Sequence, residues 1–196
     1  MLANEVRKID PRTVRTLKLL RDALNELLTE KEFAKITVQD ITGRAGVNRA
    51  TFYDRFTDKY DLLNYSVRED FQVRLDQQLP SDPMFTHDNL QLLTLTTCGY
   101  LHRFIGHCAP STRRDEQAIM LRQVQISLYD VILVWVRASL PDPKTMSPET
   151  IAMVTSSAIF GSVFQWVQTG RKLSLERLTE QVVTLLATGV GVYLVA

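Results

Sequence analysis

The side chains in this chain best suited to reading a DNA duplex lie within a few residues of one glycine, Gly46. The candidates are Asn48, Arg49, Ala50, Thr51 and Tyr53. An arginine pairs with the edge of guanine through two hydrogen bonds, and methyl groups such as those of alanine and threonine touch thymine. Tyrosine hydroxyls instead suit phosphates, which set the register of a protein on DNA without reading sequence. We therefore expect Arg49 to read a base and Tyr53 to hold the backbone.

Two further candidates, Thr37 and Lys59, flank this stretch. Asn48 within it, and Arg55 just after it, have alternative roles. The hydroxyl of Thr37 and the amine of Lys59 also suit phosphates. An alternative for Asn48 is that it caps a helix and makes no DNA contact, because asparagine is among the preferred capping residues. Arg55 is, with equal weight, a phosphate contact or a solvated surface charge.

The elements that must present these side chains are two short helices joined by a tight turn. Thr37 and Asp40 form a capping-box-like pair that starts a helix ending near Ala45, and Gly46 supplies the positive φ of the turn. Asn48 caps the next helix, which runs to about Arg55. Apolar residues at suitable spacing should bury the other face of both helices: Ile36, Val38, Ile41, Ala45, Val47, Phe52 and Phe56.

Longer helices are expected on both sides. Asp10 and Pro11 start a first helix with a buried stripe at helical spacing, made of Val14, Leu17, Leu20, Leu24, Leu27 and Leu28. Thr57 or Asp58 caps a fourth helix over about 59–78. Further helices are expected at about 87–108, 113–140, 148–169 and 174–195, and alternating strand patterns are absent. The chain is therefore expected to be all-α, with a three-helix domain at 1–65 joined by the long fourth helix to a helical domain at 66–196.

Residues 10–65 resemble the DNA-binding domain of the tetracycline-repressor-like (TetR) family of bacterial regulators. The resemblance lies in Thr37-Val38, Ile41, Ala45-Gly46-Val47, Thr51-Phe52-Tyr53, Phe56, Lys59 and Leu62-Leu63. Thr42 and Gly43 depart from it, since small or helix-favouring residues are usual there. The resemblance implies a homodimer that binds a palindromic double-stranded DNA operator, acts as a repressor, and is released by an unknown small molecule held in the carboxy-terminal domain.

The regulatory half offers weaker indications. The last helix is apolar over a wide arc, and the helix before it carries small residues such as Gly161, so both are expected to form a dimer interface. Most aromatic residues in the middle helices are ordinary core. If a ligand pocket exists there, our candidates are Tyr100, Phe104 and Trp166.

Charge, apolar runs, cysteine spacing and the absence of catalytic motifs argue against several other classes of protein. Residues 1–65 carry a net charge of +2 and the remainder −1, which argues against a nonspecific DNA binder. The amino terminus lacks a signal peptide and no unbroken apolar run approaches a membrane span, so a cytoplasmic protein is expected.

If Cys98 and Cys108 lie on one helix, they are about 15 Å apart, which is too far for a disulfide. Catalytic, metal and cofactor motifs are absent, so neither an enzyme nor a bound cofactor is expected.

Two alternatives stay open from the sequence. One is a DNA binder of low specificity without a small-molecule effector, and the other is a co-regulator that acts through another protein. Loss of basic or hydroxyl residues from the reading helix would favour the co-regulator, but Arg49, Thr51 and Tyr53 are present.

Overall fold

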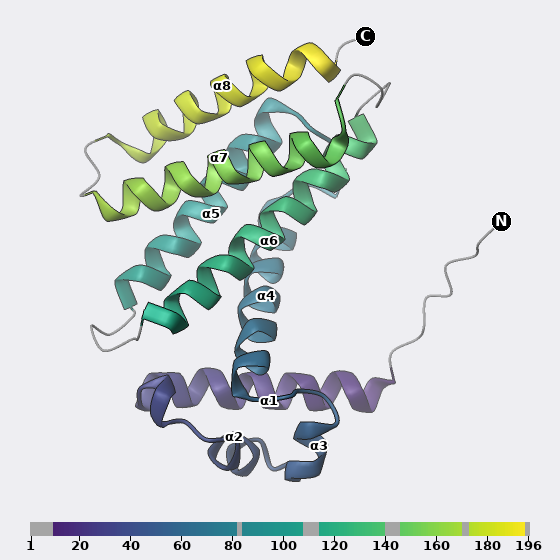
Figure 1. Cartoon of the computed structure of the whole chain (residues 1–196), viewed down its shortest axis with the longest axis vertical. Helices are drawn as coiled ribbons and strands as arrows, with labels where there is room; N and C mark the ends of the chain where they lie inside the picture. Colours follow the sequence, from purple (N-terminus) through teal and green to yellow (C-terminus); the bar gives the residue numbers. More distant parts are fainter. Residues whose placement is uncertain (1–9, 82–83, 108–113, 140–145, 170–172, 195–196) are drawn as a thin grey trace, which may run out of the picture. The chain divides into compact units, whose positions relative to one another are not determined.

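The computed structural model describes residues 10–81, 84–107, 114–139, 146–169 and 173–194. Every regular element within these ranges is helical, as the sequence predicts (Figure 1). The elements are α1 (Pro11–Glu30), the 3₁₀ turn η1 (Phe33–Lys35), α2 (Val38–Ala45), α3 (Arg49–Tyr53), α4 (Lys59–Gln78), α5 (His87–His107), α6 (Arg114–Ser139), α7 (Pro148–Gln168) and α8 (Leu175–Leu194).

The chain divides into two compact units, and the division falls inside α4, between Ser66 and Val67. The first unit contains α1, η1, α2, α3 and the start of α4. The second contains the rest of α4, α5, α7, α8 and most of α6.

The helices of the first unit begin where local capping interactions place them. The Asp10 side chain accepts a hydrogen bond from the Arg12 amide at 2.9 Å, and Pro11 occupies the first turn of α1. Asp58 starts α4 by accepting from the amides of Tyr60 and Asp61, each at 2.8 Å. Of the two caps expected for this helix, Asp58 is therefore the one that satisfies its first amides.

The core of the first unit joins α1, α2, α3 and α4. Its most deeply buried side chains are Leu20, Leu24, Ile36, Ile41, Phe52, Leu62 and Leu63, each at most 2% exposed. Of the stripe expected along α1, Leu20, Leu24 and Leu27 are buried and Leu17 and Leu28 are half-buried, but Val14 is 52% exposed, so the expectation is wrong there. Val14 is the fourth residue of α1, and the fully covered part of this helix begins at Leu20.

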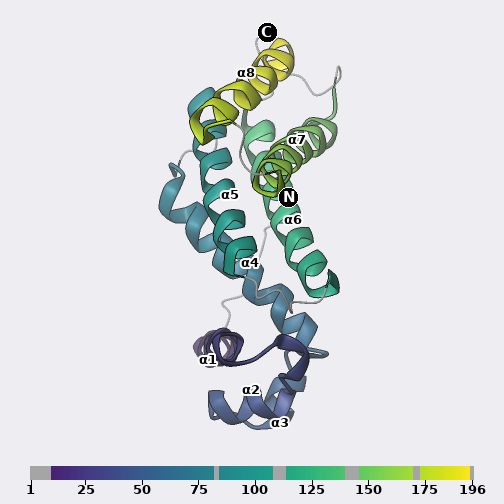
Figure 2. The same ribbon diagram turned by 90° about the vertical axis from the view of Figure 1, so that its left-hand side faces the viewer.

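In the second unit α5 packs against both α7 and α8, which run antiparallel to each other (Figures 1 and 2). Side chains that are fully buried come from every helix of this unit: Phe71, Leu90, Leu93, Leu101, Leu128, Ile132, Ile159, Val163 and Val183. Ser147 caps α7 by accepting from the Thr150 amide at 3.1 Å, with Pro148 in the first turn. The expected cap, proline and early acid, Glu149, are thus all in place.

Two helical segments, Gln117–Ser139 and Pro148–Gln168, are long and apolar enough to cross a membrane by length and composition alone. Polar and charged residues interrupt both segments, so neither contains a long unbroken apolar run that the sequence would reveal. One third of each window is buried within the chain itself. Core helices of water-soluble proteins have the same length and composition, so this is weak evidence for a membrane span.

Candidate nucleic-acid interface

The candidate reading helix, α3, is held by a cap on one side and a glycine turn on the other. The Oδ1 atom of Asn48 accepts from the Ala50 amide at 3.0 Å, so Asn48 is the cap that the sequence predicts. Gly46 has φ +66° and ψ +31°, the left-handed conformation expected of the turn. The helix spans only five residues, Arg49–Tyr53, shorter than the expected end near Arg55.

One face of α3 is exposed and the other is buried. Arg49, Ala50 and Tyr53 are exposed, Thr51 is half-buried, and Phe52 has no exposed surface. Phe52 packs against Phe56, with ring centroids 5.7 Å apart, while the Tyr53 ring is 52% exposed. Within the described ranges the guanidinium of Arg49 makes no ion pair. The structure therefore brings the expected base-reading side chains together on one solvent-facing surface.

Thr37 lies at the start of α2, but its donors are already used. Its amide and its hydroxyl both donate to the Asp40 Oδ2 atom, each at 2.8 Å, and the hydroxyl accepts from the Asp40 amide at 3.1 Å. This is a complete capping box with aspartate as the acidic partner. A hydroxyl has one proton to donate. The expected phosphate contact through this hydroxyl therefore conflicts with the cap, and Thr37 instead fixes where α2 begins.

Lys59 also differs from the expectation, because its ammonium group is turned into its own unit. The Nζ atom donates to the carbonyls of Phe33, Ala34 and Ile36 at 2.9, 3.1 and 2.8 Å. It also lies 4.6 Å from the centre of the Phe33 ring, within cation–π range. An ammonium has three protons to donate. Lys59 therefore ties the start of α4 to the end of η1 and leaves no donor for a phosphate.

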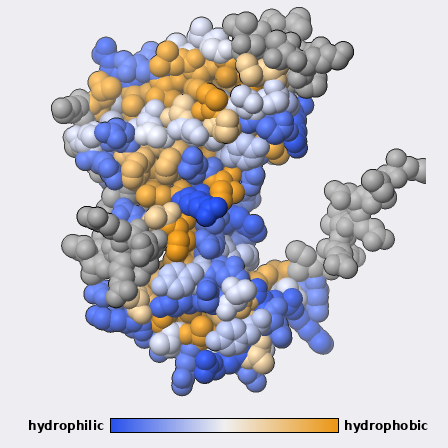
Figure 3. Space-filling model, viewed as in Figure 1, coloured by the Kyte–Doolittle hydropathy of each residue, from blue (hydrophilic) through white to orange (hydrophobic). Residues whose placement is uncertain are grey.

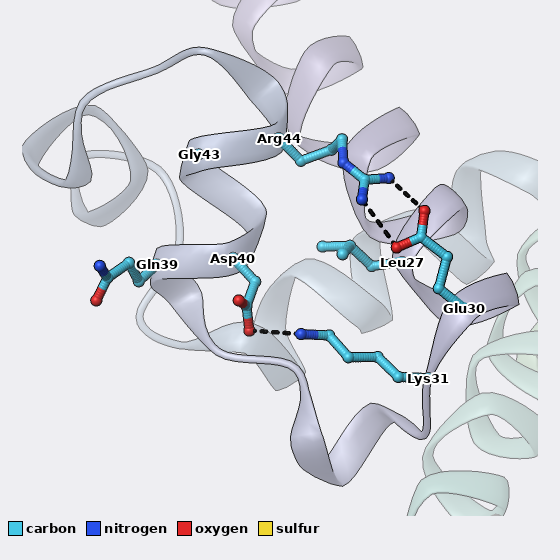
Figure 4. Close-up of a pocket in the computed structure, with 7 residues that line it drawn as sticks. All are labelled: Leu27, Glu30, Lys31, Gln39, Asp40, Gly43 and Arg44. Atoms are coloured by element: carbon cyan, nitrogen blue, oxygen red, sulfur yellow. Dashed lines mark hydrogen bonds and ion pairs between the residues drawn. The ribbon is translucent and has the colours of Figure 1, made fainter.

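Three ion pairs join α1 and the residue that follows it to α2, beside a groove of about 610 Å³ (Figure 4). Both terminal nitrogens of Arg44 donate hydrogen bonds to the Glu30 carboxylate, each at 2.8 Å. One of them also donates to Glu26 at 3.2 Å. Lys31 pairs with Asp40 at 2.9 Å (Figure 4). The Arg44–Glu30 bond raises the pKa of Arg44 and lowers that of Glu30. Because these charges pair with one another, they link α1 to α2. The groove therefore does not present free charges to a ligand.

These ion pairs were not predictable from the sequence, although Asp40 is recognisable there as a cap. Glu30 lies 14 residues before Arg44, so no local pattern links them. For Arg55 the sequence favours a phosphate contact and a solvated charge equally. In the structure its Nη2 atom donates to the Thr13 hydroxyl at 3.0 Å, and the side chain stays exposed.

Residues 20–65 match the model of bacterial regulatory proteins of the tetR family. This range holds the whole turn, α2, α3 and the residues that bury them. The similarity to the TetR family covers this region, which is less than half of the chain. A curated relative, an uncharacterized HTH-type transcriptional regulator, YxbF of Bacillus subtilis (strain 168), is 41% identical over 63 residues. That alignment covers 32% of this chain and 17% of the length of YxbF.

Solved structures of TetR-type regulators share the fold over nearly the whole chain. A TetR transcriptional regulator from Rhodococcus sp. RHA1 has a TM-score of 0.55 and 18% identity, covering 91% of this chain and 97% of its own. The dihydroxyacetone kinase operon activator DhaS has a TM-score of 0.53 and 22% identity, covering 92% and 98%. At these identities the likeness establishes the TetR-type fold and nothing finer.

The capping carboxylate of α2 makes a pH-dependent contribution to the stability of the first unit. The bond from Lys31, followed by those from the Thr37 amide and hydroxyl, lowers the pKa of Asp40 from 3.8 to about 2. A carboxyl whose pKa falls on folding stabilises the fold above its unfolded pKa, and this contribution is lost as the pH drops through the folded value. We expect Asp40→Asn to lower the melting temperature at neutral pH, with the gap to wild type closing between pH 4 and about 2.

Thermal unfolding followed by circular dichroism across this pH range measures that gap. Glu32→Gln is the control, because the one ion pair of Glu32 with a described residue is with the exposed Lys35, at 3.3 Å. A gap for Asp40→Asn that stays constant down to pH 2 would contradict the assignment.

The candidate pocket residues of the regulatory half are not gathered around one described groove. Tyr100 is 8% exposed and packs against Phe71, with ring centroids 5.0 Å apart. Trp166 is partly exposed and its Nε1 atom donates to the Leu173 carbonyl at 2.9 Å. The side chain of Phe104 lies outside the described residues. Neither Tyr100 nor Trp166 lines the two grooves described in this unit, between α4 and α6 and between α4 and α5.

Among the described side chains, no group of three or more His, Cys, Asp or Glu residues is placed to hold a metal ion. Cys98 is buried in α5, 1% exposed. Cys108 lies outside the described residues, so the expectation that the two cysteines do not pair stays a prediction.

Proposed function

We propose that this chain is a cytoplasmic transcriptional repressor that binds a palindromic operator as a homodimer and responds to a small molecule. In this proposal residues 1–65 bind DNA, and residues 66–196 dimerise and hold the effector. The observation that carries it is the exposed face of α3, whose opposite face is locked in the core by Phe52. Its placement within a TetR-family segment supports DNA as the partner. Similarity of residues 20–65 to a family of bacterial regulatory proteins also supports a non-enzymatic role.

On DNA, the amino-terminal residues of α3 enter the major groove. Arg49 donates to a guanine edge, while Ala50 and the Thr51 methyl group touch thymines. The Tyr53 hydroxyl and the first amides of α2 bind phosphates on either side, since helix amino termini favour anions. Asn48 keeps its capping role, and we no longer count Lys59 or the Thr37 hydroxyl among the DNA contacts.

The homodimer is proposed from the surface of α7 and α8. Val183, Leu186 and Val190 of α8 are buried within the unit, whereas Leu185 on the same helix is 75% exposed. Met153 and Val154 of α7 are more than half exposed. Hydrophobic side chains gather on the surface over these two helices (Figure 3). Such a patch marks an interaction surface, and a two-fold axis would pair it with itself.

We expect wild type to be a dimer at micromolar concentration and Leu185→Glu to be a monomer, because a buried unpaired carboxylate opposes association. Multi-angle light scattering measures the mass directly. Val73→Glu is the matched control, since Val73 of α4 is 45% exposed and lies outside α7 and α8. A monomeric wild type would make α8 an ordinary core helix and remove the dimer from the proposal.

Selection of bound sequences from random duplexes tests the function as a whole. Enrichment of an inverted repeat, with half-sites about one turn or roughly 34–36 Å apart, supports an operator-binding dimer. Binding without enrichment, with a steep salt dependence, would mean a low-specificity DNA binder. Repeating the selection with a metabolite panel identifies an effector as the compound that abolishes enrichment. Because DhaS is named an activator, transcription in vitro decides the sign, and a rise on adding this protein would overturn the repressor.

Arg49→Ala is expected to weaken operator binding by about 1–3 kcal/mol and to relax the preference at a single base pair. Tyr53→Phe should instead weaken binding evenly across sequences, since a phosphate contact carries no base preference. Binding measured on operators substituted at each position separates the two patterns. Arg68→Ala is the control, because it removes an exposed arginine of α4 that belongs to the second unit. Unchanged affinity for both Arg49→Ala and Tyr53→Phe would show that another face docks on DNA.

A further inference from the structure

A groove of about 270 Å³ lies between α4 and α5 in the second unit. Arg74 and two glutamines of α4 line one side, and Leu92, Leu95, Thr96 and Gly99 of α5 line the other. The groove thus has an apolar wall beside a cation. Its volume is slightly below the range of about 300 to 1,000 Å³ that is typical of small-molecule sites, so it suits a small ligand.

Arg74 is a partly dehydrated cation with no acidic partner among the described residues. Its guanidinium carbon lies 5.5 Å from the centre of the Tyr100 ring. Its Nε atom is inaccessible to solvent and has no hydrogen-bond acceptor. Arg44 of the first unit shows the usual arrangement, with two carboxylates satisfying the guanidinium. Burying part of a charge without an acceptor is unfavourable, so the Arg74 site favours binding of an anion.

Gly99 supplies a second, independent feature of the same groove. A Cβ atom added at this position would meet no other atom within 4 Å, so neither a close approach nor backbone strain requires glycine. Glycine in a helix interior is destabilising relative to alanine. What glycine provides at this position is open space along the groove, beside the ring on which Arg74 stacks.

We propose that this groove binds the effector and that the effector is a small amphipathic monocarboxylate. The carboxylate pairs with the guanidinium of Arg74, and the apolar part lies against Leu92 and Leu95. Arg74 is the one charged residue among those that line the groove. A single cation matches a singly charged carboxylate better than a doubly charged phosphate, whose dehydration needs more than one cation. The inference rests on the proposed response to a small molecule and names its chemistry.

The test uses the full-length protein with benzoate and octanoate as probes. Benzamide, octanol and inorganic phosphate are the comparison compounds, because the first two keep the shape without the charge. Titration calorimetry and thermal shift should show that at least one carboxylate binds wild type and raises its melting temperature. Neither the neutral analogues nor phosphate should do so. If no carboxylate binds wild type, or if benzamide or phosphate binds equally well, the proposal is overturned.

Variants locate the binding. Arg74→Gln should weaken carboxylate binding by roughly 10-fold or more, and Arg74→Lys should retain part of it. Arg68→Gln is the matched control, because it removes the same charge from an exposed position of α4 outside the groove. Gly99→Leu should fill the groove and abolish binding, whereas Gly99→Ala should keep the fold at least as stable and perturb binding less. Unchanged binding by Arg74→Gln, or by Gly99→Leu, would overturn the site.

The DNA selection separates failure of this inference from failure of the proposed function. An enriched inverted repeat with no carboxylate binding refutes the groove and leaves the regulator. Carboxylate binding that depends on Arg74, without any enriched sequence, establishes the groove and refutes the regulator. Release of an enriched operator by the bound carboxylate in wild type, but not in Arg74→Gln, supports both.

Discussion

Replacing Phe52 with alanine is expected to lower the free energy of unfolding by about 3–5 kcal/mol, the usual range for a fully buried phenylalanine. Phe52 has no exposed surface and its ring packs against Phe56. Whole domains are stable by only about 5–15 kcal/mol, so this single change removes much of the margin. A five-residue helix does not persist without tertiary packing. We therefore expect operator binding to be lost together with the fold of the first unit.

Denaturant unfolding and operator binding, measured side by side, check this expectation. Tyr53→Ala is the control for stability, because the adjacent tyrosine is 52% exposed. It should change the free energy of unfolding by about 1 kcal/mol or less, while still weakening the DNA complex. A similar loss of stability in both variants would mean that α3 is not held through Phe52.

Lys59→Met is expected to destabilise the first unit by about 3 kcal/mol. The variant keeps a similar length but leaves the carbonyls of Phe33, Ala34 and Ile36 without their donor. Hydrogen bonds to a charged group contribute about 1.5–3 kcal/mol each, and partial access of water to these carbonyls lowers the sum. Because Lys59 joins α4 to the segment just before α2, its loss should also loosen the turn that presents α3.

Urea unfolding of full-length protein gives the size of this effect. Lys35→Met is the matched control, since the Lys35 side chain is 69% exposed and, in the part of the chain that the structure describes, forms an ion pair with Glu32 alone. It should cost about 0.5 kcal/mol or less. If the two variants are equally stable, the three carbonyl bonds contribute little and Lys59 would again be available to a phosphate.

Local interactions explain why most helix starts were predictable from the sequence. Asp10, Thr37, Asn48 and Ser147 all cap helices as expected, because each bonds an amide two or three residues away. The turn at Gly46 follows equally from one residue with a positive φ. Periodicity likewise placed the long helices to within one or two residues of the observed bounds.

Roles that depend on distant partners were not predictable. Lys59 bonds carbonyls 23 to 26 residues earlier, which turned an expected phosphate contact into a structural tie. Arg44 meets Glu30 only because α1 and α2 pack together. Arg74 looks like any surface arginine in sequence, and its buried Nε without an acceptor is visible only in three dimensions. Val14 fits the helical period yet is exposed, because periodicity cannot tell where the covering helices end.

The two glycines near the turn illustrate how differently one residue type constrains future variation. A Cβ atom added at either Gly43 or Gly46 would meet no other atom within 4 Å, so steric clashes do not distinguish the two positions. Only Gly46 has a left-handed backbone, which penalises every L-residue there regardless of room. Gly43 lies inside α2 with an ordinary helical backbone, and alanine would strengthen that helix. Position 43 can therefore accept substitutions during evolution, whereas at position 46 the chirality of L-residues alone disfavours them.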